Sequence, residues 1–248
     1  MKVILSLYDM HVPYNIPLSG IEAYAKDLSA DFGKIGRVYG GDNMGFDEIS
    51  HWNKRKLRQI EGRRLRHSYD IMNRILDRQD KICKGEIHYL YGNHEDWIEQ
   101  LLDELPQLEG LFEPEKYLKL KERGYKVYPP NYYARVGKLM FIHGMFHNLH
   151  HAKKTVERIG RSVVYGHTHT HQAFTVNSPI DSQDIHRGVC VPCLFDFKKY
   201  ARYLKSKPTN WSHGFGVTFF NDKGYFQHCN IDIVRGRFIG LNGKEYKN

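Results

Sequence analysis

Five short apolar segments of this chain each run directly into Gly, Asp, Asn or His, and this repeated design constrains the fold more than any other feature. In chain order they are KVILSLYDMH, RVYGGDN, IHYLYGNHE, KLMFIHG and SVVYGHTH. Short runs of β-branched and aromatic residues that end in Gly and polar residues are typical of buried strands. We therefore expect five strands, each followed at once by polar side chains.

Helical patterns separate these strands. Apolar residues recur at helical spacing within 21–32, 60–76 and 97–105, and a further helix is expected over 150–159, ending at Gly160. Strands alternating with helices indicate an α/β domain, and 248 residues suffice for one domain with a substantial core. The C-terminal segments FGVTFFND and YFQHCNIDIV lack an intervening helix, so we expect them to form a second, more antiparallel sheet.

The polar residues after the strands are expected to converge in space. In α/β sheets, functional groups gather beyond the carboxyl ends of the strands. The five clusters offer carboxylate and imidazole, carboxylate, amide and imidazole, imidazole, and two imidazoles. This mixed set without thiolate suits Mn, Fe, Zn or Ni better than Mg. A carboxylate that bridges two cations about 3.5–4 Å apart is the arrangement of two-metal hydrolases.

The series D-x-H, G-D, G-N-H-E, H-G and G-H-x-H resembles the calcineurin-like metallophosphoesterases, a superfamily of Ser/Thr phosphatases, purple acid phosphatases and DNA-repair nucleases. The resemblance runs from Asp9 to His169 with every motif in family order. It implies an α/β fold, a sandwich of two mixed β-sheets flanked by α-helices, as a single domain over 1–248. The opening DMHVPY and the compact length resemble small members from bacteria and phages. A cytoplasmic location, in the host if a phage encodes the protein, is the matching expectation.

Carried onto this chain, the resemblance implies two divalent ions, Mn first and Fe, Zn or Ni as alternatives. It also implies hydrolysis of phosphate mono- or diesters by in-line attack of a metal-bridging hydroxide. His94 resembles the catalytic histidine, a general acid, and Glu95 resembles the acidic residue that orients it. The implied ligands are Asp9, His11 and His169 for the first ion, Asp42 as the bridge, and Asn93, His143 and His167 for the second.

The three alternating histidines of GHTHTH allow two interpretations. On a plain strand, His167, His169 and His171 would share one face and could form a three-imidazole zinc site. The glycine at 166 instead indicates a turn, so that His167 and His169 diverge, one toward each ion of the family's centre. His171 has no counterpart in the motif and is expected either at the start of the next strand or as a neighbour of the ligands that binds no ion.

The substrate is less constrained. A net charge of +9 indicates an anionic partner, and basic segments lie at about 46–80 and about 197–207. Basic residues interleaved with aromatics can track DNA or RNA, although solvated helix faces have the same composition. Candidate substrate contacts are Asn43, His213 and Arg64.

Three functions stay open at this point. They are a phosphomonoesterase or phosphodiesterase, a DNA nuclease or exonuclease with the same site, and a non-catalytic nucleic-acid-binding protein. The complete set of ligands argues against the third. No run of 18 apolar residues is present, so no membrane association is expected.

Overall fold

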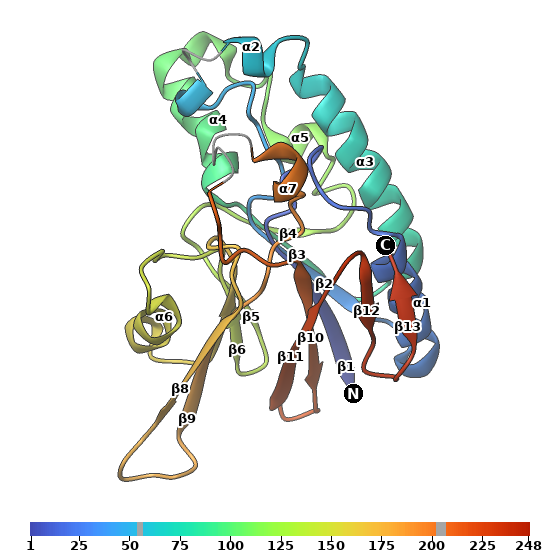
Figure 1. Ribbon diagram of the computed structural model, residues 1–248, viewed down its shortest axis with the longest axis vertical. Helices are drawn as coiled ribbons and strands as arrows, with labels where there is room; N and C mark the ends of the chain where they lie inside the picture. Colours follow the sequence, from blue (N-terminus) through green and yellow to red (C-terminus); the bar gives the residue numbers. More distant parts are fainter. Residues whose placement is uncertain (54–56, 202–206) are drawn as a thin grey trace.

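The protein is described by a computed structural model covering residues 1–53, 57–201 and 207–248 (Figure 1). Two mixed β-sheets pack against each other and helices cover their outer faces. The fold class predicted from the sequence is confirmed. No helix in the described ranges is long and apolar enough to cross a membrane.

The first sheet has the strand order β11-β10-β1-β2-β3-β4. Its parallel part consists of β1 (Lys2–Leu7), β2 (Gly36–Gly40), β3 (Ile87–Leu90) and β4 (Lys126–Tyr128). The strands β10 (Gly214–Phe220) and β11 (Phe226–Asp232) extend it antiparallel to β1.

The expectation that these two C-terminal segments form a second sheet is therefore wrong. Both are strands, and their mutual pairing is antiparallel as expected. However, Val3 of β1 faces Phe219 of β10, so the hairpin continues the first sheet. Alternation along a strand predicts the strand itself, but it does not specify which free edge the strand joins.

The second sheet has the order β5-β6-β7-β9-β8. Its strands are β5 (Ala134–Val136), β6 (Leu139–Phe141), β7 (Val163–Tyr165), β8 (Gln172–Asn177) and β9 (Ile185–Cys190). The central strands β6, β7 and β9 are parallel, and β5 and β8 are antiparallel at the edges. A shared apolar layer that includes Ile4, Val38, Phe141 and Val164 fills the space between the sheets.

Helices α1 (Ser19–Phe32) and α3 (Leu65–Ile82) pack on the outer face of the first sheet. Helix α6 (His151–Ile159) packs on the second sheet and ends at Gly160 in the left-handed conformation, as predicted. Helix α4 (Asn93–Glu104) begins directly after β3. The shorter elements are α2 (Leu57–Ile60), α5 (Pro114–Tyr117), α7 (Phe197–Tyr200), β12 (Arg237–Ile239), β13 (Glu245–Lys247) and the 3-10 turns His51–Asn53 and Pro106–Leu108.

Candidate metal centre

The five polar loops meet where β1, β2, β3, β6 and β7 end (Figure 1). Side chains from these loops form three overlapping groups in which potential ligand atoms lie within 4.8 Å of one another. The groups are Asp9, His11 and His169; His11, Asp42 and His94; and Asp42, His143 and His167. Each sequence-predicted ligand except Asn93 belongs to one of these groups, and Asn93 touches the third.

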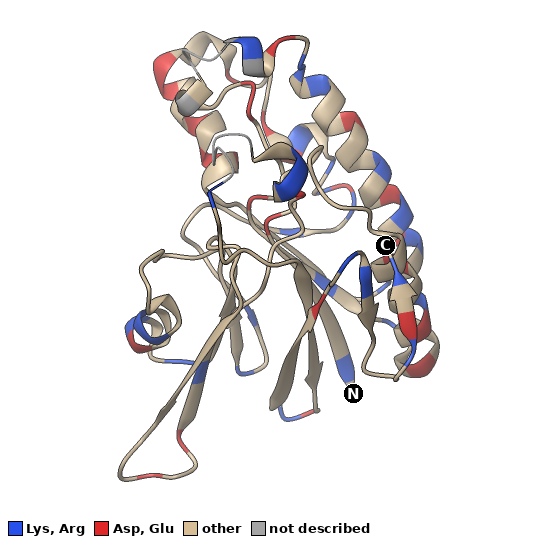
Figure 2. Ribbon diagram, viewed as in Figure 1, with Lys and Arg blue, Asp and Glu red and all other residues tan. Residues whose placement is uncertain are grey.

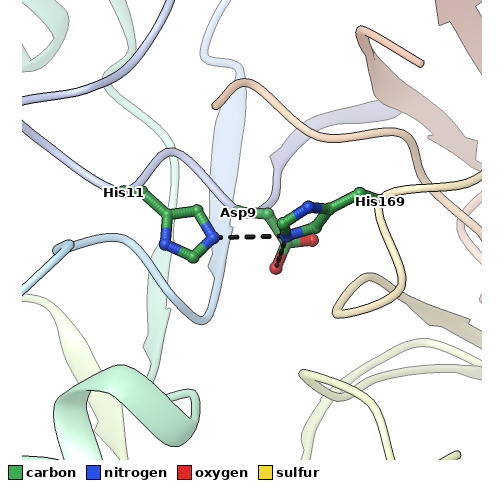
Figure 3. Close-up of side chains that lie close together, drawn as sticks. All are labelled: Asp9, His11 and His169. Carbon is green, nitrogen blue, oxygen red and sulfur yellow. Dashed lines mark hydrogen bonds and ion pairs between the residues drawn. The ribbon is translucent and has the colours of Figure 1, made fainter. Parts of the chain in front are cut away.

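The first group is compact and buried (Figure 3). His11 Nε2 lies 3.2 Å from His169 Nε2, and His169 Nε2 lies 3.6 Å from Asp9 Oδ1. Two nitrogen ligands of one ion, each about 2.0–2.1 Å from it, are separated by about 2.8–3.0 Å in octahedral geometry and about 3.3–3.4 Å in tetrahedral geometry. The spacing of the two imidazole nitrogens therefore fits a single shared cation.

Asp42 lies between the first group and the third. Its Oδ2 is 3.4 Å from His143 Nε2 and 4.0 Å from His11 Nε2. His143 Nε2 is also 3.1 Å from Asn93 Oδ1, and the His143 and His167 rings are 5.0 Å apart. One carboxylate oxygen thus faces both imidazole groups, as a bridging ligand requires.

The histidines at 167 and 169 point to different groups. His169 joins Asp9 and His11, whereas His167 joins His143 and Asp42. Their neighbour His171 is exposed, directly precedes β8 and pairs with Asp232 at 3.4 Å. A three-imidazole site from one strand is absent from this loop, because the chain turns after Gly166.

Hydrogen bonds outside the groups fix the orientation of the rings. His143 Nδ1 donates to the Gly40 carbonyl at 3.1 Å, which leaves Nε2 free to face Asp42. His94 Nδ1 donates to the Gly45 carbonyl at 2.6 Å, and its Nε2 lies 3.8 Å from Asp42 Oδ2. The His94 ring also packs on Trp97, with 3.8 Å between ring centroids.

Glu95 has a different neighbourhood from the one the family resemblance implied. Its two carboxylate oxygens accept four backbone N–H groups, from Gly92, Asp42, Asn43 and Met44, at 2.8–3.0 Å. Its side chain is buried. The contacts of Glu95 therefore hold the loop that carries Asp42, and they involve His94 only through the shared helix start.

The backbone is strained where the candidate ligands lie. Positive φ angles of 47–71° occur at five of them: Asp9, His11, Asp42, His167 and His169. Each left-handed non-glycine residue costs about 1–2 kcal/mol, and such strain tends to concentrate at functional sites. The surrounding packing must compensate for this cost, and the clustering of such residues here marks the loops as a candidate functional site.

Two glycines allow backbone and ligands to approach closely. A Cβ atom on Gly166 would lie 2.5 Å from Asp9 Oδ2, and one on Gly92 would collide with Asp42 Oδ1. The N–H of His167, next to Gly166, donates to Asp9 Oδ2 at 2.8 Å. The Gly residues in the G-H and G-N motifs thus make room for the carboxylates.

The donor set fits divalent cations. Asp9 Oδ1 is buried and has no hydrogen-bond donor in the described ranges. An unpartnered buried carboxylate oxygen is costly unless a cation compensates it. Carboxylate, amide and imidazole ligands are those of Mn, Fe or Zn. Residues Asp9, His11, Asp42, Asn93, His143, His167 and His169 would hold such ions.

The electrostatics of the centre suit a cation at His11, whereas His143 would have to release a proton before its Nε2 could bind one. Burial and the neighbouring His94 imidazole hold the pKa of His11 well below its ordinary value. Although burial opposes it, the Asp42 carboxylate raises the pKa of His143 to about 9. Burial would also raise the pKa of Asp42, yet the His143 and His94 imidazoles hold it well below its usual range. An ionised carboxylate thus lies beside a neutral His11 that offers a lone pair.

The predicted substrate contacts lie in three different places. Asn43 is fully buried and donates from Nδ2 to the Leu90 carbonyl at 2.9 Å, so it supports β3 and cannot touch an ester. His213 is partly buried and donates to the Phe195 carbonyl at 3.0 Å. Arg64 is exposed at the start of α3. Of the predicted basic residues, Lys54, Arg55, Lys56, Arg202 and Lys205 lie outside the described residues.

Sequence reasoning missed the support for the loop that carries His167 and His169. The buried His151 ring contacts the Tyr165 hydroxyl at 2.6 Å and Thr170 Oγ1 at 3.1 Å. Trp211 packs edge-on against His169 with 4.5 Å between centroids. The helix expected over 150–159 gives no signal that His151, at its first residue, points into the protein.

Comparisons with known proteins give distant similarities. No protein-family model matches the chain. The Gene 54 protein of Mycobacterium phage D29 is 26% identical over 255 residues, or 96% of each chain. Vacuolar Protein Sorting 29 from Cryptosporidium parvum superposes with a TM-score of 0.42 at 12% identity, covering 100% of this chain and 98% of that one.

Two further solved structures are similar at the same level. Chaetomium thermophilum Vps29 gives a TM-score of 0.43 at 11% identity over 99% of this chain and 94% of its own. A 5'-nucleotidase precursor from Thermus thermophilus gives 0.39 at 10% identity over 92% of this chain and 54% of its own. These superpositions transfer no function. The fold is therefore described by its own topology, two mixed sheets with five polar loops where β1, β2, β3, β6 and β7 end.

Proposed function

We propose that the protein is a metal-dependent phosphoesterase that hydrolyses phosphate mono- or diesters at a dinuclear centre. The observation that carries this proposal is the position of Asp42 Oδ2, which lies 3.4 Å from His143 Nε2 in one imidazole group and 4.0 Å from His11 Nε2 in the other. Two ions bound there would neutralise the phosphoryl oxygens and acidify a bound water. A phosphate ester resists hydrolysis because the attacking hydroxide and the phosphoryl group are both anionic. The positive charge of two cations would reduce this repulsion.

In the proposed reaction, His94 would protonate the leaving oxygen of the substrate, and its neighbours would hold the imidazole in place. The bond from His94 Nδ1 to the Gly45 carbonyl, at 2.6 Å, leaves Nε2 as the atom that can carry a proton toward the substrate. The Trp97 ring, 3.8 Å away, limits rotation of the imidazole. A positioned general acid that protonates the leaving oxygen contributes roughly 10²–10⁴-fold to the rate. His94 also lies in one of the three ligand groups, so its role needs a direct test.

The test separates ligation from proton transfer. Purified wild type, His94→Asn and His171→Ala are loaded with Mn²⁺ and assayed on p-nitrophenyl phosphate and its bis ester, with metal content measured on the same samples. We expect His94→Asn to retain its metal but lose about 10²–10⁴-fold in kcat. The exposed His171→Ala is the matched control and should be unaffected.

Two outcomes would contradict the proposal in different ways. Metal loss in His94→Asn would make His94 a ligand and move the general acid elsewhere. Absence of turnover on both esters by wild type with two ions bound would favour a non-catalytic binding protein.

A further inference from the structure

A hollow of about 480 Å³ opens beside the candidate metal centre, between the start of α3 and α7. Residues from three separate parts of the chain line it, among them Tyr14, Glu48, Arg63, Arg64, His67 and Tyr200. The centre described above uses none of these side chains. The hollow is therefore available for the part of a substrate that does not react.

The hollow joins the two basic segments that the sequence singled out. Arg63 comes from the segment at 46–80 and Tyr200 from the segment at 197–207. The guanidinium of Arg63 lies over the Tyr14 ring at 4.7 Å, and the Tyr14 and Tyr200 rings are 5.0 Å apart. Figure 2 shows Lys and Arg on α7 and along α3. Two stretches more than a hundred residues apart thus meet at one aromatic corner.

Tyr14, which lines the hollow, is linked to the candidate centre through His11 and Gly45. The Tyr14 N–H donates to the His11 carbonyl at 2.8 Å, closing a four-residue turn whose end Cα atoms lie within about 7 Å. A Cβ atom on Gly45 would touch the Tyr14 ring at 3.0 Å, and the Gly45 carbonyl accepts the bond from His94 Nδ1. A group in the hollow would therefore adjoin the proposed general acid.

The polar groups of the hollow favour a ligand with both donors and acceptors. Arg64 and His67 are exposed donors. Glu48 Oε1 accepts from Ser68 at 3.3 Å, whereas its buried Oε2 has no partner in the described part of the chain. Arg63 is already paired with Asp47 at 2.5 Å. The carboxylates disfavour a ligand that is only anionic, while a nucleobase offers N–H donors, acceptors and an aromatic face.

We propose that this hollow binds the nucleoside part of the substrate, with the base against Tyr200 and the ester phosphate at the metal centre. Tyr200 is the partly exposed ring; the buried Tyr14 contacts it with 5.0 Å between centroids, and Lys199 Nζ lies 4.9 Å from its centroid, where it could also meet a phosphate. The substrate class is then a nucleoside phosphate ester, either a mononucleotide or single-stranded nucleic acid. This assignment rests on the proposed phosphoesterase function only for the position of the phosphate.

Binding to chelator-treated protein tests the hollow independently of catalysis. Calorimetric titrations with guanosine 5'-monophosphate, with an oligothymidylate of about 12 nucleotides and with inorganic phosphate are compared across variants. Stacking of one base on an aromatic ring is worth about 1–3 kcal/mol, so Tyr200→Ala should weaken nucleotide binding about 5- to 150-fold. Tyr200→Phe keeps the ring and should stay within about threefold. Tyr225→Ala, at an exposed tyrosine on the β10–β11 turn, is the matched control and should bind as wild type.

The outcomes divide clearly. Loss with Tyr200→Ala and retention with Tyr200→Phe support the proposal, and a preference for the oligonucleotide or the mononucleotide identifies the source of the nucleoside. Equal binding by Tyr200→Ala and wild type, or equal affinity for inorganic phosphate and nucleotide, would overturn it. Because the titration contains no metal, an inactive enzyme would leave this result intact, and the two proposals can fail separately.

Discussion

The carboxylate of Glu95 offers a sharp test of how the bridging ligand is held. The perturbation is Glu95→Gln, which preserves shape but replaces one oxygen by an NH₂ group. In the wild type, Oε1 accepts from the N–H groups of Asn43 and Met44, and Oε2 accepts from those of Asp42 and Gly92. Whichever way the amide is turned, two backbone donors face another donor.

The expected magnitude follows from those contacts. Each buried N–H left without an acceptor costs about 1–3 kcal/mol, so two of them cost about 2–6 kcal/mol. We therefore expect Glu95→Gln to lower the free energy of unfolding by several kcal/mol and to weaken metal binding, because the Asp42 loop is released.

Urea unfolding with and without Mn²⁺, together with metal analysis, measures both effects. Glu99→Gln, on an exposed turn of the same helix, is the control and should change stability by less than about 0.5 kcal/mol. If Glu95 acted by orienting His94, the variant would keep its stability and metal and lose only kcat. That pattern would refute the role assigned here to the four backbone hydrogen bonds.

Two further predictions concern groups away from the ligands. His151→Phe removes two buried hydrogen bonds beneath the loop that carries His167. The free energy of unfolding in urea should fall by about 1–3 kcal/mol, while the number of bound metal ions stays the same. An unaltered urea midpoint would contradict this prediction. Burial lowers the pKa of His228 from 6.5 to about 4, so below pH 6.5 the unfolded chain takes up a proton that the folded chain does not. The free energy of unfolding of the wild type should therefore fall by about 1–2 kcal/mol between pH 7 and pH 5. The fall should be smaller in His228→Gln, and equal pH profiles for the two proteins would exclude a contribution from His228.

The sequence alone was sufficient to predict the five strands and the polar residues that follow them. Apolar runs followed by Gly, Asp or His are local signals. Because functional groups gather at the carboxyl ends of strands, Asp9, Asp42 and His143 could be predicted to lie close together, and they belong to the overlapping groups of the centre. The turn at Gly166 correctly separated His171 from its two neighbours. In these cases short-range chemistry determines the structure.

Contacts between segments far apart in the chain could not be predicted from the sequence. The hairpin of β10 and β11 joined the edge at β1, because pairing partners depend on which edges stay free in the assembled sheet. The family resemblance implied that Glu95 orients His94, whereas its carboxylate accepts the Gly92 N–H at the start of α4 and three N–H groups from the loop after β2, a contact that only the fold creates. The tilted contact between the Tyr14 and Tyr200 rings depends on the fold, because neither segment carries a local signal for the other.

Asp42 is proposed to join two metal sites, and metal binding tests this directly. Metal-stripped protein should be titrated with Mn²⁺, with bound ions counted after removal of free metal, in wild type, His169→Ala and Asp42→Asn. We predict two ions per chain in wild type, one in His169→Ala, and weakened binding at both sites in Asp42→Asn. A single ion in wild type, or full occupancy by two ions in Asp42→Asn with unchanged affinity, would contradict the dinuclear centre.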